Sequence, residues 1–146
     1  MATQASMYQR NGGVITKTAS ATLSDFEAGG PILINAAGGC TITLPAATGT
    51  GYQYFLYGAA TQTGDFVLNA STNGADVVGI ADLGNDSAGA SRFYAAATSN
   101  TVTLNGTTKG GIKGWRIIVT DFLTDEYHVE ILSEASGTEA TPFSAA

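Results

Sequence analysis

The feature that most constrains the fold is a series of short stretches in which apolar and polar residues alternate, separated by clusters of Gly, Asn and Asp. A period of two is typical of β-strands, and helical periodicity is hard to find in this chain. Gly and Asn tolerate the positive φ of tight turns, so the separators fit connections between strands. We therefore predict an all-β fold. The clearest predicted strands are residues 31–35, 40–44, 52–57, 65–69, 92–96, 101–105, 114–121 and 127–132.

The same alternation predicts which side chains point into the core, because successive residues of a strand face opposite sides of its sheet. Along 127–132, Val129 and Ile131 share one face, while His128 and Glu130 share the other. We expect the last two predicted strands to form an antiparallel hairpin, since only residues 122–126 connect them. The predicted core anchors are Ile42, Leu44, Trp115, Ile117, Val119, Val129 and Ile131.

The length of 146 residues fits one domain with its own core. We predict a compact antiparallel β-sandwich or barrel-like domain over residues 31–132. Residues 1–30 would form an extended N-terminal arm and a first strand, and residues 133–146 a flexible C-terminal tail. The Thr-Val-Thr-Leu motif at 101–104 echoes Thr-Ile-Thr-Leu at 41–44, so two similar β-units could pack face to face.

Charge is scarce and acidic: 12% of the residues are charged and the net charge is −6. Nucleic-acid binding is therefore not expected, because phosphate contacts need clustered Lys and Arg. No apolar run is long enough for a spanning helix, and the sequence begins without the apolar core of a signal peptide, so we expect no membrane partner. A neutral surface rich in small residues indicates that part of it lies against other protein.

Residues for catalysis are also scarce, since the chain has one His and one Cys. His128 is expected on a half-exposed sheet face and Cys40 in the core, where a thiol is inert. The carboxylates of Asp121, Asp125 and Glu126 cluster in one predicted turn rather than across a groove. The Asx-rich segment 82–87 lacks the ligand pattern of an EF-hand. We predict no enzyme, no cofactor, no metal and no small-molecule substrate.

Two groups of residues are candidates for protein contacts. Residues 1–13 are too polar to build a core, yet they carry Tyr8, Arg10 and Asn11, which we predict to contact a partner, since aromatic and Arg side chains often anchor interfaces. The strand 52–57 carries aromatic residues on both of its faces. The expected arrangement is core on one side and an interface on the other, although such aromatics could also stack sugars.

Several segments together resemble the small head decoration, or cement, proteins of tailed bacteriophages. They are Thr-Ile-Thr-Leu-Pro-Ala-Ala-Thr-Gly at 41–49, the strand 52–58, Thr-Val-Thr-Leu-Asn-Gly-Thr-Thr at 101–108, the Gly-Trp strand from 114, and Ser-Gly-Thr-Glu-Ala-Thr-Pro-Phe-Ser at 136–144. The resemblance covers about residues 40 to 144. The Thr-Ile-Thr-Leu-Pro pattern with its turn is also similar to segments of phage tail fibres.

The resemblance implies a structural virion protein that is made in the bacterial host cytoplasm and sits on the outer capsid surface. Such proteins commonly form homotrimers at or near three-fold positions, where they bridge major capsid subunits and stabilise the shell. Two alternatives remain. A receptor- or glycan-binding domain of a tail fibre would bind sugars, and a small hydrolase would need a pocket with carboxylates around His128.

Overall fold

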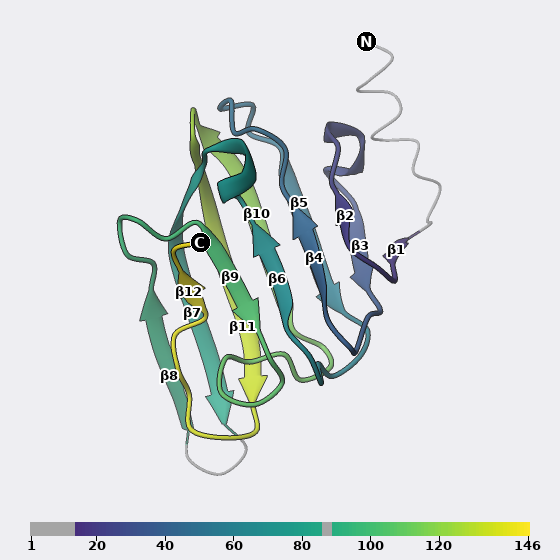
Figure 1. Cartoon of the computed structure of the whole chain (residues 1–146), viewed down its shortest axis with the longest axis vertical. Helices are drawn as coiled ribbons and strands as arrows, with labels where there is room; N and C mark the ends of the chain where they lie inside the picture. The colour runs from purple at the N-terminus through teal and green to yellow at the C-terminus, as the bar shows by residue number, and fades with distance from the viewer. Residues whose placement is uncertain (1–13, 86–88) are drawn as a thin grey trace.

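The computed structural model describes residues 14–85 and 89–146. These residues form a sandwich of two β-sheets packed face to face around one core (Figure 1). The predicted all-β sandwich is therefore confirmed. The predicted contact residues Tyr8, Arg10 and Asn11 lie outside the described residues.

The larger sheet has seven strands, with the predicted hairpin at its centre. The hairpin is confirmed, because β10 (Arg116–Leu123) and β11 (Glu126–Ala135) pair antiparallel with Ile117 opposite Ile131. Its turn is tighter than expected and consists of Thr124 and Asp125, with Asp125 at a φ of 60°, a conformation that Asp adopts more readily than most residues. In spatial order the strands are β1 (Ile15–Lys17), β3 (Pro31–Ile34), β5 (Gln53–Gly58), β10 (Arg116–Leu123), β11 (Glu126–Ala135), β7 (Asp76–Asn85) and β8 (Gly89–Tyr94).

The smaller sheet has five strands and lies in front of the larger one in Figure 1. Both segments of the sequence echo belong to it, as β4 (Cys40–Thr43) and β9 (Thr101–Leu104) on either side of β6 (Phe66–Asn69). The echo therefore does not correspond to two units that face each other. Two short 3-10 helices, η1 (Asp25–Glu27) and η2 (Ser71–Asn73), complete the elements. In spatial order the strands are β12 (Phe143–Ser144), β9 (Thr101–Leu104), β6 (Phe66–Asn69), β4 (Cys40–Thr43) and β2 (Ala21–Thr22).

Both sheets are mixed, whereas we predicted antiparallel strands throughout. From β1 to β6, successive strands alternate between the two sheets. Each crossing to the opposite sheet and back returns the chain in its original direction. The pairs β1–β3, β3–β5, β2–β4 and β4–β6 are therefore parallel. Short turns predicted antiparallel neighbours, but here such turns connect the two layers instead.

Strand β7 is absent from the predicted strands, because Gly and Asp interrupt its apolar residues. It instead pairs parallel with β11 along its whole length, and the Asx-rich residues 82–85 belong to it. Gly79 is required here because its φ is +137° and a Cβ would collide with the carbonyl oxygen of Val129. The glycine that weakens the sequence signal thus allows β7 to lie against β11.

The core lies between the sheets and contains all seven predicted core anchors. Trp115 is 1% exposed and joins the two layers, because its ring lies 4.8 Å from that of Phe66 on the smaller sheet. It also covers Gly58 of β5, where a Cβ would collide with the indole. Trp115 is the largest fully buried side chain of the described residues.

The two ends of the described chain are also part of the fold. Residues 14–30, assigned to an arm and a first strand, form β1, β2 and η1, and Leu23 and Ala28 are buried. Residues 133–146 were expected to be a flexible tail. In the structure Ser133–Ala135 extends β11, and Phe143 is buried where β12 pairs with β9. The short strands were missed because two or three residues show no period.

Candidate functional site

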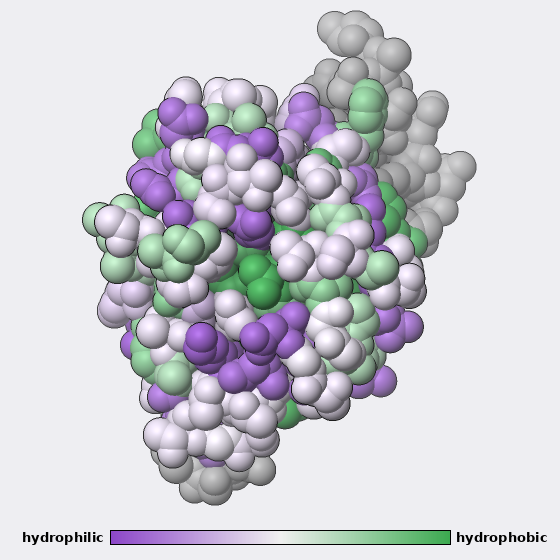
Figure 2. All heavy atoms as spheres, viewed as in Figure 1, coloured by the Kyte–Doolittle hydropathy of each residue, from purple (hydrophilic) through white to green (hydrophobic). Residues whose placement is uncertain are grey.

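The outer faces of the two sheets differ in chemistry. On the smaller sheet the outward side chains are short and mostly polar, with Thr41 and Thr43 on β4, Asn69 on β6 and Thr103 on β9. Figure 2 shows this side of the molecule as largely pale, with hydrophilic clusters, a hydrophobic spot near the centre and further hydrophobic residues at the margins. A face of this kind is compatible with direct contact with water.

The larger sheet carries large apolar side chains outward, although this face has no covering layer in the described structure. Tyr94 is 68% exposed and Leu132 is 54% exposed, while the other members are partly buried. We call this set the outer apolar face. Its members are Leu33, Phe55, Tyr57, Val78, Ile80, Tyr94, Ile118 and Leu132.

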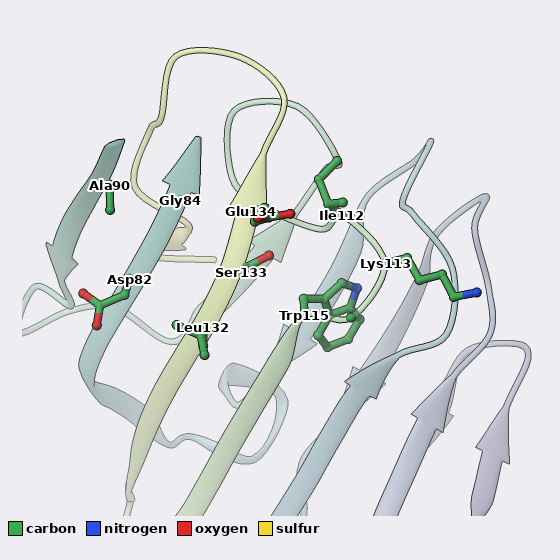
Figure 3. A pocket seen from close by; sticks show the side chains of 10 residues that line it. Asp82, Gly84, Ala90, Ile112, Lys113, Trp115, Leu132, Ser133 and Glu134 are labelled. Carbon is green, nitrogen blue, oxygen red and sulfur yellow. The ribbon is translucent and has the colours of Figure 1, made fainter. Parts of the chain in front are cut away.

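Two shallow hollows occupy one end of the outer apolar face, over β7, β8 and β11. The first has a volume of about 390 Å³ and extends to the loop before β10, where Ile112 and Lys113 form its wall (Figure 3). The second has a volume of about 290 Å³ and includes Arg116 and Glu130. Asp82 and Leu132 line both hollows, so the two are neighbours.

An ion pair crosses this end of the face from β7 to β8. Nε and Nη2 of Arg92 donate to the two carboxylate oxygens of Asp82 at 2.7 and 3.1 Å. These bonds from Arg92 hold the pKa of Asp82 below its ordinary value. The pair is solvent-exposed, so it orients the two side chains but adds little stability.

We predicted no catalytic site, and the positions of the titratable residues bear on that prediction. His128 lies on the outward side of β11, and its ring contacts that of Phe122 edge to face at 6.1 Å. Cys40 is a free, buried thiol, and burial raises its pKa, which disfavours the reactive thiolate. Among residues 14–85 and 89–146, no three His, Cys, Asp or Glu side chains gather closely enough to hold a metal ion.

Asp121 was expected to be a turn former and is in fact a buried strand residue that binds a different turn. Its carboxylate accepts hydrogen bonds from the backbone N–H groups of Thr48, Gly49 and Thr50 at 2.8–3.2 Å, and from the Thr50 hydroxyl at 2.7 Å. Burial raises the pKa of Asp121, but the bonds from Thr50 and its neighbours outweigh burial and lower it overall. The carboxylate of Asp121 therefore holds the turn at residues 48–50 in place.

The sequence pattern indicated part of the outer apolar face. The aromatic strand 52–57 does divide as expected, with Tyr54 in the core and Phe55 and Tyr57 outside. The contribution of β7 was missed together with the strand itself. A second apolar series on the outward positions of β5, β7 and β10 was the signal that could have identified the whole face.

No protein-family model, curated protein or solved structure matches this chain. In the part of the chain that the structure describes, no helix is long and apolar enough to cross a membrane. The candidate site therefore has to be interpreted from its own residues.

Proposed function

We propose that this chain is a structural virion protein that binds the outer surface of a phage capsid and stabilises the shell by bridging major capsid subunits. The observation that carries the proposal is the outer apolar face. Large apolar side chains in contiguous outward positions mark interaction surfaces on soluble proteins. The resemblance of residues 40–144 to head decoration proteins supplies the partner, the major capsid protein.

The composition of the face suits a protein partner better than a reactive ligand. Most of its outward side chains are aromatic or aliphatic, such as Phe55 and Ile118. Two charged residues lie among them, with Arg116 opposite Leu132 and Glu130 opposite Ile118. Protein interfaces are enriched in aromatic residues and Arg and also contain polar groups. Bridging two neighbouring subunits also needs breadth, which a sheet of seven strands provides.

The same proposal places the protein on the virion exterior after synthesis in the host cytoplasm. It includes a homotrimer on the capsid, because the resemblance implies three-fold positions and a closed ring uses the same contact in each copy without forming filaments. The predicted contacts of Tyr8, Arg10 and Asn11 belong to this proposal. Deletion of residues 1–13 should weaken capsid binding at least tenfold and leave the thermal midpoint nearly unchanged.

The decisive experiment measures binding to undecorated capsids of the phage that encodes this chain, by co-sedimentation. Tyr57→Lys places a charge in the centre of the outer apolar face and should weaken binding at least tenfold. Thr43→Lys places the same charge on the other sheet and should bind as the native chain does. Equal binding by both variants would exclude the outer apolar face as the contact.

The hollows favour one alternative, a receptor- or glycan-binding domain of a tail fibre. A volume of about 390 Å³ lies within the range of small-ligand sites. Exposed Tyr94 could stack on a sugar ring, and Asp82 and Arg92 could bind hydroxyl groups. A glycan array probed with the native chain and with Tyr94→Ala tests this alternative. Specific binding that Tyr94→Ala abolishes would favour it over the capsid proposal.

A further inference from the structure

The edges of the two sheets are unequal. In the described residues, three of the four edge strands are very short, with three residues in β1 and two each in β2 and β12. The fourth edge, β8, has six residues, from Gly89 to Tyr94. Short edge strands offer little template for another strand, whereas a long one exposes a row of unpaired main-chain groups.

The direction of those groups follows from the pairing of β8 with β7. The N–H of Ala95 donates to the carbonyl of Gly79 at 3.1 Å, and Tyr94 lies opposite Ile80. Bonded and non-bonded pairs alternate along an antiparallel ladder, so Phe93 and Ser91 also bond to β7. The main-chain groups of Ala90, Arg92 and Tyr94 therefore point away from the sheet. No described segment bonds to them.

Nothing in β8 protects this edge by the usual means. The strand contains no Pro, and its register with β7 shows no bulge. Its one charged residue is Arg92, whose charge is matched by Asp82 of the same face. Natural proteins usually guard such an edge with an unmatched charge, a Pro or a bulge. An unguarded edge of six residues indicates that another strand covers it.

The geometry points to a second copy of this chain as the occupant, with β8 pairing antiparallel to β8 of its partner about a two-fold axis. Arg92 would lie opposite the partner's Tyr94, and Tyr94 opposite the partner's Arg92. Each guanidinium would then lie beside an exposed aromatic ring, which attracts cations, and the two-fold axis makes the contact twice. The alternative register with Arg92 opposite its own counterpart places like charges face to face, which is unfavourable.

This pairing would join two sheets of seven strands into one continuous sheet and make the two outer apolar faces coplanar neighbours. The inference does not rest on the proposed function, since it concerns the free protein in solution. Failure to bind capsids would leave it standing. It specifies a dimer for the free chain, in contrast to the trimer proposed on the capsid.

Analytical ultracentrifugation of the whole chain over a range of concentrations tests the inference. The native protein should approach twice its monomer mass of 14.8 kDa as concentration rises. Arg92→Pro removes an N–H that points away from β7, a position at which an edge strand tolerates Pro. It should raise the dimer dissociation constant at least tenfold while the circular dichroism spectrum stays unchanged. Arg92→Ala keeps the N–H and should have a smaller effect.

Tyr94→Pro removes the second outward N–H that the assigned register uses and replaces Arg92→Pro if that variant misfolds. The register is tested by mixing Arg92→Cys with Tyr94→Cys under mild oxidation, which should give mainly the mixed disulfide. Homodisulfides of Arg92→Cys alone would show the like-charge register instead and overturn the assigned one. A native chain that stays monomeric at all concentrations, or proline variants that associate as strongly as native, would overturn the inference.

Discussion

The two sheets share one core but present different faces to their surroundings. Outward positions of the smaller sheet hold residues such as Thr41 and Thr103, whose β-propensity is high and whose hydroxyl groups suit water. Outward positions of the larger sheet hold Phe55, Tyr57 and Leu132. Both sets favour strands, so strand formation does not explain the difference. The contrast indicates that only one of the two faces is built to be covered.

The first way to test this comparison is to ask whether the two sheets depend on the same core. Trp115→Ala should destabilise the fold by about 3–5 kcal/mol, because it removes a large buried aromatic and leaves a cavity against Phe66. Arg116→Ala, at the exposed neighbouring position, should change stability by about 0.5 kcal/mol or less. The denaturant midpoints of the two variants measure these changes in stability. A loss below about 1 kcal/mol for Trp115→Ala would mean that the inner face is assigned wrongly.

A second variant tests the close approach of β7 to β11 inside the larger sheet. Gly79→Ala should cost about 2–4 kcal/mol, since the new Cβ meets the carbonyl oxygen of Val129 and φ is positive. Gly74→Ala is the matched control, because Gly74 also has a positive φ but open space around it. Thermal unfolding of both variants measures the difference. Equal losses would show that backbone conformation alone, and not the strand contact, accounts for the cost.

A third variant tests the bond between the centre of the larger sheet and the turn at residues 48–50. Asp121→Asn should cost about 1–3 kcal/mol near neutral pH, because an amide accepts fewer of the hydrogen bonds that the carboxylate holds. The pKa of Asp121 is lowered in the folded state. Its stabilisation is therefore complete above the unfolded pKa, about 3.9, and is lost as pH falls through the lower folded value.

Urea titrations at several pH values measure this dependence. The gap between native and Asp121→Asn should be widest above about pH 5 and should close in strong acid. A gap that stays constant down to the most acidic pH would contradict a carboxylate held in its ionised form.

The two variants with the smallest expected effect on stability compare the two outer faces directly. Leu132→Lys and Thr43→Lys should each change the free energy of unfolding by about 0.5 kcal/mol or less, because both side chains stand on outward positions. Only Leu132→Lys should reduce the retention of the protein on a hydrophobic-interaction column. A loss of several kcal/mol for Leu132→Lys would show that this side chain belongs to the core instead.

Much of the fold could be predicted because a period of two is a local property of the chain. It located β4, β10 and β11 and the inward side of each, including Trp115. The direction of pairing could not be predicted, since a short turn does not reveal whether the chain stays in its sheet or crosses to the other. Strand β7 was missed because Gly79 and Gly84 interrupt its pattern. The outer apolar face depends on strands from distant parts of the sequence, so no single segment reveals it.

The alternation of strands between the layers has a consequence for how the chain acquires its structure. Through β6, neither sheet contains two strands that are consecutive along the chain. A nascent chain that ends near residue 70 can therefore complete no hairpin, and every pairing it makes must close a loop through the opposite layer. Loop closure of this kind costs entropy before contacts repay it, which slows folding. The hairpin of β10 and β11 is the longest local unit and arrives late in synthesis. The N-terminal half of the chain thus has to remain soluble until the C-terminal half supplies the centre of the larger sheet. The outward positions of β2, β4 and β6 carry few large apolar side chains. This composition limits aggregation of the incomplete chain during biosynthesis as well as of the finished protein.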